Sequence, residues 1–246
     1  MTNLTAADLQ IRGIPAIEKL LDLANNEIPI PLGPGNRAPV VAYGLFMNLA
    51  HQAYALMLLR EQDADHACAA LRRSLIEHTA SLLWLADDTE KAVNAINRGL
   101  QYTQKKLKEA AHKAGMGQDE RTQATLAATL AELLPSAETH LLQHSKLVDA
   151  YLGPTLGAIW HAESGYAHPS IHVVRLYVEQ NGDDTKLHKR PRLDAAQQTV
   201  ATCLYALYCG ALALNSLTQE PLWEPTLRSI AEDLGLSMEL PRRNTT

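Results

Sequence analysis

The sequence contains few residues that favour β-strands. Its 246 residues include a single phenylalanine, Phe46, with 10 isoleucines and 8 valines against 40 leucines and 36 alanines. Leucine and alanine favour helices, whereas β-branched and aromatic residues favour strands. This composition disfavours a large sheet and predicts an all-α, single-domain bundle of about eight to ten helices with an aliphatic core.

Cysteine and positive charge are also scarce. The three cysteines, Cys68, Cys203 and Cys209, each lie in an apolar stretch. This pattern indicates buried thiols in a reducing compartment and disfavours a disulfide framework. The formal net charge of −5 excludes a generally basic, DNA-coating protein but leaves a local basic patch open. The first ten residues lack the basic and apolar regions of a signal peptide, so we expect a cytoplasmic protein.

One long segment, residues 195–219, has no charged side chain. Its length would suffice to cross a bilayer, but Gln, Thr, Asn and Ser residues interrupt it and no Lys/Arg-rich flank anchors it. A buried central helix fits this pattern better. No membrane association is therefore predicted.

Proline, glycine and capping residues divide the chain into helices of one expected domain, residues 1–246. Residues 1–38 should hold N-terminal helices and a Pro/Gly-rich connection, residues 39–217 the central bundle, and residues 218–246 a C-terminal helix and a disordered tail. An Asn-Gly turn follows the least helical segment, so a short β-hairpin or extended excursion is expected near residues 171–190. The expected central helices cover 39–59, a segment from a cap at Asp63 or Asp65 to 87, 90–113, 119–134, 136–152, a segment from 154, and 194–217.

The predicted helix at residues 67–87 has an unusual second face. With 100° of rotation per residue, Leu75 lies in a core stripe, whereas the opposite face carries Arg73, Glu77 and Trp84 among small residues. A solvent face would carry more charge, so we expect both faces to be packed. Arg73 and Glu77 then form a partly buried pair, which either pins the helix or lines a polar cavity or interface.

Residues 160–172 form a second concentration of polar side chains. No HExxH motif or Glu-x-x-His pair occurs there and Pro169 interrupts the helix, so we predict neither a metal nor another cofactor. Ser164 and His168 are expected to project from a helix end toward a polar site, or to cap that end. The candidate metal ligands in the segment are His161, Glu163, His168 and His172.

Two other groups of titratable residues are assigned to the surface. His140 and His144 lie four residues apart without a third ligand nearby, so both are expected on a solvent face. A basic run in the predicted loop either contacts phosphates or is simply solvated. It consists of Lys186, His188, Lys189, Arg190 and Arg192.

The string RSLIEH at residues 73–78 resembles the Arg-x4–6-His motif of the HEPN superfamily (higher eukaryotes and prokaryotes nucleotide-binding). Those proteins are all-helical, and many are metal-independent ribonucleases of toxin–antitoxin and phage-defence systems whose site forms at a dimer interface. The resemblance implies a homodimeric ribonuclease in which Arg73 stabilises the phosphorane charge and His78 acts as general acid or base, with Glu77 beside them. The basic loop, with Lys186, Lys189 and Arg190, would contact the RNA.

A second resemblance spans roughly residues 40–215. Arg73-x3-Glu77, Trp84, Asp87-Asp88 and Ser164-x3-His168-Pro169 are similar to an uncharacterised bacterial all-helical family in which an Arg-x3-Glu helix precedes a Ser-x3-His-Pro segment. It implies one site formed by Arg73, Glu77, Ser164 and His168, with Trp84 as a further contact. The alternative function is therefore a non-catalytic helical module whose pocket binds a small anionic ligand or a protein partner.

Overall fold

The computed structural model of the chain describes residues 4–25, 37–115, 139–182, 184–191, 195–218 and 220–243. Within these ranges the regular structure is helical apart from one two-stranded hairpin, so the predicted all-α bundle with a short hairpin is confirmed. The predicted helix at 119–134 and the last residues of the predicted tail, 244–246, lie outside the described residues.

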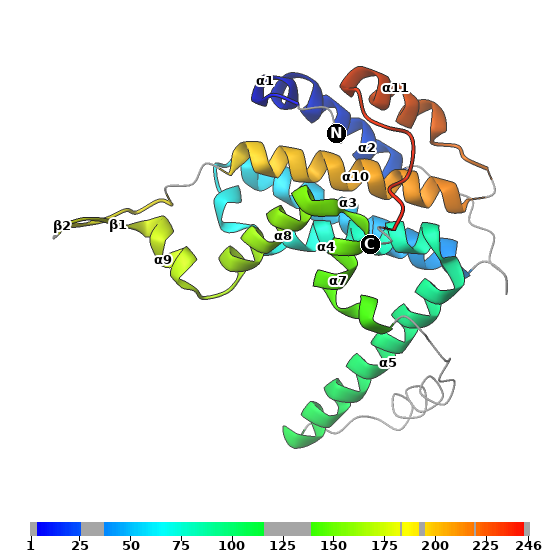
Figure 1. The fold of residues 1–246 in the computed structure, drawn as a ribbon, viewed down its shortest axis with the longest axis horizontal. Coiled ribbons are helices and arrows are strands. Elements are labelled where there is room, and N and C mark those ends of the chain that lie inside the picture. The colour runs from blue at the N-terminus through cyan, green and yellow to red at the C-terminus, as the bar shows by residue number, and fades with distance from the viewer. Residues whose placement is uncertain are drawn as a thin grey trace.

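The longer helices are α3, α4, α5, α8 and α10, and the chain adds shorter helices and helical turns between them (Figure 1). The elements in chain order are α1 (Ala6–Asp8), η1 (Leu9–Gly13), α2 (Ile14–Asn25), α3 (Arg37–Glu61), η2 (Asp65–Ala67), α4 (Ala69–Asp87), α5 (Thr89–Lys113), η3 (Thr139–Leu142), α7 (His144–Tyr151), α8 (Gly153–Ala167), α9 (Ile171–Tyr177), β1 (Val178–Asn181), β2 (Asp184–Leu187), α10 (Ala196–Leu217) and α11 (Glu224–Leu234).

Helices α10 and α4 form the centre of the bundle. Helix α10 packs on α2, α3 and α4, and it is apolar on nearly every side, as expected for a fully enclosed helix. Among the described helices it alone is long and apolar enough to cross a membrane, but 72% of its most apolar stretch is buried in the bundle. This burial agrees with the core helix predicted for residues 195–219.

Helix α4 is packed on both faces, as its sequence predicts. It contacts α3 and α10 on one side and α7 and α8 on another. Leu75 is fully buried in the predicted core stripe, and Trp84, from the opposite face, is 1% exposed. The dual packing explains why the helix carries small residues where a solvent face would carry charge.

The structure differs from the sequence predictions in three places. The predicted helix at 136–152 is, in its described part, the 3-10 turn η3 followed by α7, which begins at His144. Helix α4 begins after Cys68, because Asp65 is buried in the preceding 3-10 turn and does not cap the helix. Residues 171–177 form helix α9, although their β-branched residues suggested an extended segment. Strand propensity depends on packing against neighbouring strands, and among the described residues no strand pairs with this segment.

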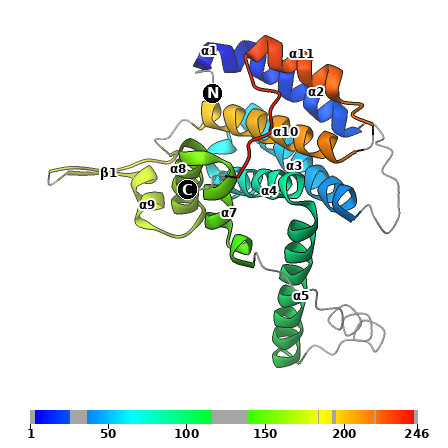
Figure 2. The ribbon, with the colours of Figure 1, turned by 45° about the vertical axis from the view of Figure 1, so that its right-hand side comes forward.

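The hairpin follows directly after α9 in the chain. Strands β1 and β2 pair antiparallel around Gly182, whose φ of 62° suits the Asn-Gly turn predicted there. The hairpin extends from one end of the body (Figure 1), and α5 extends from another side (Figure 2). The compact part of the molecule therefore lies around α4 and α10, where the polar groups discussed below converge.

Candidate functional site

Arg73 lies on α4 and contacts residues of both α4 and the end of α8. Its Nε donates to Oε1 of Glu77 at 2.8 Å, and its Nη1 lies 2.9 Å from Nε2 of His168. Because an arginine only donates, His168 accepts at Nε2 and carries its proton at Nδ1. The side chains of Arg73 and Glu77 are 23% and 16% exposed, so the ion pair is partly buried at the protein surface.

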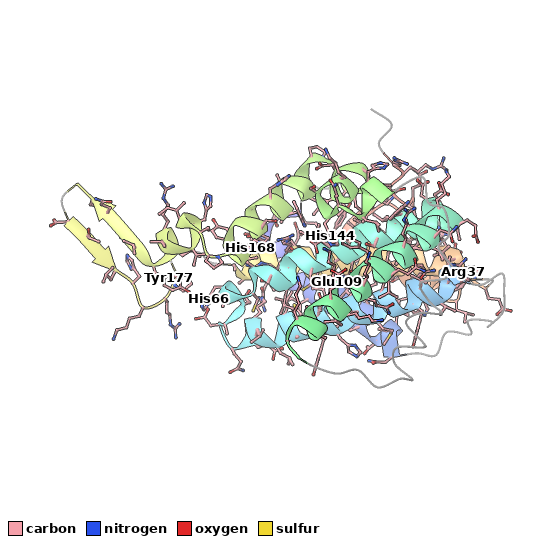
Figure 3. All side chains as sticks on the ribbon, turned by 90° about the horizontal axis from the view of Figure 1, so that it is seen from below. Arg37, His66, Glu109, His144, His168 and Tyr177 are labelled. Carbon is pink, nitrogen blue, oxygen red and sulfur yellow. The ribbon has the colours of Figure 1, made fainter. Side chains whose placement is uncertain are left out.

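Trp160 and His144 complete this group of residues. The guanidinium carbon of Arg73 lies 4.9 Å from the centroid of the Trp160 ring, a cation–π geometry. The indole Nε1 donates to the same Oε1 of Glu77 at 3.0 Å, while Oε2 of Glu77 lies 3.8 Å from Nδ1 of His144. Helices α4, α7 and α8 therefore meet at Glu77, and Figure 3 shows His144 and His168 on the two elements beside this part of α4.

Sequence analysis did not include Trp160 and His144 in this site. Trp160 lies one helical turn before Ser164, so the i,i+4 spacing was an available signal. His144 is half-exposed as predicted, but the fold places it against Glu77, a contact that sequence spacing does not reveal. We refer to Arg73, Glu77, Trp160, His168 and His144 as the Arg73 cluster.

Ser164 lies beside the Arg73 cluster without taking part in its hydrogen bonds. Its hydroxyl donates to the carbonyl oxygen of Trp160, one turn earlier, at 2.7 Å. The serine thus satisfies its donor within α8. Its hydroxyl oxygen keeps a lone pair for a further donor.

His78 lies on the side of α4 that faces α3. Its Nδ1 is 2.8 Å from the carbonyl oxygen of Ser74, and its Nε2 is 2.8 Å from Nδ2 of Asn48. A carbonyl only accepts, so Nδ1 donates and Nε2 accepts from the amide. Both ring nitrogens are therefore occupied, and within one chain the structure does not bring His78 and Arg73 into the same site.

The remaining predicted ligand contacts also lie apart from the Arg73 cluster. Trp84, expected from the sequence as a further ligand contact, is buried in the core at 1% exposure. Lys186 lies on the hairpin opposite Glu179, and Lys189 is exposed after it. Arg190 donates to Oδ2 of Asp63 at 2.6 Å, whereas Arg192 lies outside the described residues.

Arg72 forms a second ion pair, which sequence analysis missed. Its Nε and Nη2 donate to the two carboxylate oxygens of Glu163 at 2.8 and 3.2 Å, and both side chains are almost completely buried. Nη1 donates to the backbone oxygen of Asp65 and to Oγ1 of Thr199, while Gln198 donates to Glu163. This network satisfies a buried charge pair that would otherwise be very costly.

Helical rotation could have found Arg72, because it lies about 60° from Leu75 and therefore beside the core stripe. Glu163, considered from the sequence as a metal ligand, is committed to Arg72 in the structure. Among the described residues no group of three His, Cys, Asp or Glu side chains is arranged to hold a metal ion.

Burial in the same core keeps two of the cysteine thiols protonated. Burial raises the pKa of the Cys203 thiol to about 12, and the charge of Arg72 opposes this increase only in part. Burial likewise raises the pKa of Cys209 to about 12. Neither thiol is therefore an available nucleophile near neutral pH.

Cavities lined by described residues occur along the C-terminal segment, residues 235–242. One of about 690 Å³ is lined by that segment and by Leu83, Ala86 and Asp87 at the end of α4. Another of about 360 Å³ lies between the segment and Tyr205 and Tyr208 of α10. These cavities are separate from the Arg73 cluster, since none of its five residues lines them.

Comparisons with protein-family models, curated proteins and solved structures found no match for this chain. The two resemblances noted from the sequence therefore remain similarities of motif.

Proposed function

We propose that this chain is a non-catalytic helical module that binds a small anionic ligand at the Arg73 cluster. The observation that carries the proposal is the guanidinium of Arg73, which is held in one orientation while its Nη2 has no hydrogen-bond partner among the described residues. Both N–H groups of Nη2 on this fixed, partly exposed cation thus remain for an acceptor from outside the chain.

The fixed orientation lowers the cost of binding. Glu77 holds Nε, His168 holds Nη1, and the Trp160 ring lies against the guanidinium. A flexible surface arginine would lose rotamer entropy when a ligand bound, but this side chain has already lost it on folding. A carboxylate or phosphate oxygen at Nη2 would therefore gain a charge-assisted hydrogen bond at little further entropic cost.

The negative charge of Glu77 repels a bound anion, but the position and hydrogen bonds of its carboxylate reduce this repulsion. Its Oε1 accepts from both Arg73 Nε and Trp160 Nε1, so two donors partly neutralise that oxygen. The carboxylate lies at the Nε side of the guanidinium, whereas His168 lies at its Nη1 end. His168 carries its proton at Nδ1 and so adds an N–H donor to the cluster.

Thermal unfolding with a panel of anions tests the proposal. Phosphate, sulfate, citrate and mononucleotides are added in turn, and at least one should raise the Tm in a concentration-dependent way, because a ligand that binds only the folded state stabilises it. Arg73→Gln should abolish this increase. The matched control is Arg190→Gln, which removes an exposed guanidinium from the hairpin region and should retain it. The proposal fails if no anion raises the Tm or if Arg73→Gln still responds.

The ribonuclease that the HEPN resemblance implies is a separate prediction with its own assay. Structured RNA is incubated with the protein in EDTA, and cleavage products are resolved on a denaturing gel. If the wild type cleaves RNA and His78→Ala does not, the chain is a ribonuclease and the binding proposal is wrong. Intact RNA, together with anion-dependent stabilisation that requires Arg73, supports the binding module.

A further inference from the structure

The outward face of α3 is unusual because it has no charge. Residues 39–59 of this helix contain no Asp, Glu, Lys or Arg. Surface helices normally carry such residues on the solvent side. Four large side chains on this face are nevertheless well exposed, Val40 at 43%, Tyr43 at 39%, Tyr54 at 53% and Leu58 at 43%.

These residues form one continuous stripe. With 100° of rotation per residue, eight exposed or half-exposed positions fall within about 60° of one line along the helix, whereas Asn48, which is also exposed, lies about 80° from that line. The stripe runs from Val40 to Leu58, a distance of 18 residue steps or about 27 Å at 1.5 Å per residue. We define the α3 face as Val40, Tyr43, Gly44, Met47, His51, Tyr54, Ala55 and Leu58.

Its composition matches an interface between proteins. Tyrosine and methionine are enriched at the centres of such interfaces and charged residues are depleted, and a continuous exposed apolar patch is uncommon on a monomer. The exposed apolar residues of α5 differ, since Leu107 lies among Lys105, Lys106 and Lys108. The α3 face is therefore the stronger candidate for a docking surface.

The lack of charge on the α3 face allows a second copy of the chain to bind there. Two copies of a chain with a net charge of −5 repel each other, and most pairs of identical surfaces would bring like charges together. The α3 face brings none together. A two-fold symmetric dimer also requires a surface that is complementary to itself. Pairing the residues of two antiparallel α3 faces one by one shows whether this surface is.

We infer that the chain forms a homodimer in which two α3 helices pack antiparallel through their α3 faces, about a two-fold axis at the height of residue 49 along the helix. In this register Val40 faces Leu58 of the second copy, and Met47 faces His51. Tyr43 faces Ala55, and Gly44 faces Tyr54, so each tyrosine meets a small residue. A Cβ placed on Gly44 would have no atom within 4 Å, so this position offers open space to the incoming tyrosine ring. Alternation of large and small side chains allows two helices to interdigitate closely.

The mass of the protein in solution gives the first test. Light scattering after gel filtration should give about 54 kDa at micromolar concentration, twice the 27.0 kDa of the chain. Tyr54→Glu should give a monomer, because it places two carboxylates in the apolar interface. Tyr102→Glu is the matched control, since Tyr102 is 63% exposed on α5 and its replacement should leave the dimer intact. Circular dichroism checks that each variant is helical.

A charge pair tests the register. Val40→Lys and Leu58→Glu should each weaken the dimer at least tenfold, and the double variant should recover most of the loss through two symmetric Lys–Glu pairs. The two positions are about 27 Å apart on one helix, so they cannot pair within a chain. A monomeric wild-type protein overturns the inference, as does a dimer that Tyr54→Glu and Leu58→Glu leave intact. If the double variant dimerises no more tightly than the single variants, the antiparallel register is wrong.

Discussion

Arg72 and Arg73 are adjacent on α4, and each binds a glutamate, but the two ion pairs differ in burial. The side chains of Arg72 and Glu163 are 1% and 0% exposed, whereas those of Arg73 and Glu77 are 23% and 16% exposed. The guanidinium of Arg72 uses all three nitrogens within the chain. Arg73 uses two of its three, so only the second pair retains a capacity for binding.

The difference follows from helical geometry. One residue step rotates the side chain by 100°, so Arg72 points into the core beside Thr199 of α10, while Arg73 points to the edge where α4, α7 and α8 meet. A buried charge must be fully hydrogen-bonded to be tolerated. An arginine at a surface edge can keep one N–H donor hydrogen-bonded to water, and a ligand can replace that water. Burial, more than residue type, separates the structural arginine from the binding one.

The largest predicted effect comes from breaking the buried pair. Glu163→Gln keeps the shape of the side chain but leaves the Arg72 charge uncompensated in the core. We expect a loss of about 3–5 kcal/mol in the free energy of unfolding. Urea denaturation followed by circular dichroism measures it. A loss under about 1 kcal/mol would contradict the view that this pair carries a buried charge.

A double variant separates charge from packing. Arg72→Met with Glu163→Leu removes both charges and keeps comparable volume, and such replacements are often neutral or stabilising. The double variant should therefore be more stable than Glu163→Gln alone. If it is equally unstable, the loss comes from the packing of the site and the charge argument is wrong.

The second prediction concerns the buried thiol of Cys203, which donates to the backbone oxygen of Ala53. The pKa of Cys203 is raised from about 9 to about 12, mainly by burial. Above pH 9 the unfolded chain releases this proton while the folded chain keeps it, so stability is complete below pH 9 and falls as the pH rises toward 12. Cys209, with its pKa also raised to about 12, acts in the same direction. Each thiol lowers the free energy of unfolding by roughly 1 kcal/mol per pH unit in this range.

Urea midpoints at pH 8, 9 and 10 measure this dependence. Replacing both thiols, Cys203→Ala with Cys209→Ala, should reduce the slope between pH 9 and 10 compared with wild type. Cys68→Ala is the comparison variant, because this thiol is only partly buried and its pKa is raised less strongly. An unchanged slope in the double variant would show that other groups govern alkaline stability.

The sequence predicts the fold well where periodicity is long and turn chemistry is specific. Helix α10 and the Asn-Gly hairpin follow directly from an uncharged run and a turn motif. Helix α9 was predicted incorrectly because local strand propensity carries little information without a neighbouring strand. The start of α4 was misplaced because two aspartates looked like caps, and only the three-dimensional packing buries Asp65.

Prediction of the candidate site is limited by contacts between distant segments. The i,i+4 pair of Arg73 and Glu77 is local, and sequence spacing identifies it. His144 meets Glu77 only because α7 folds back onto α4, a contact between segments far apart in the chain. Arg72 was overlooked for a different reason, because a charged residue beside a core stripe is more often exposed.

The two sides of α4 also separate the binding and ribonuclease proposals. His78 bonds to Asn48 of α3, whereas Arg73 bonds to His168 after α8. The α3 face defined above includes neither His78 nor Arg73. The two residues can therefore be tested independently, since Tyr54→Glu should affect assembly without changing the anion response of Arg73.

The smallest predicted stability change comes from the partly exposed pair. Glu77→Gln should cost about 1 kcal/mol or less in the free energy of unfolding, because exposed and partly exposed ion pairs contribute little and the amide oxygen still accepts from Arg73 and Trp160.

The same substitution should strengthen anion binding. Removing a negative charge about 4 Å from the ligand is worth roughly 1 kcal/mol in a water-like dielectric, about a fivefold increase in anion affinity. Titration calorimetry with the anion that stabilises the wild type measures this gain. Glu109→Gln, which makes the same charge change on α5, should leave the affinity unchanged, so an equal gain in both variants would indicate a general charge effect and no specific site at Arg73.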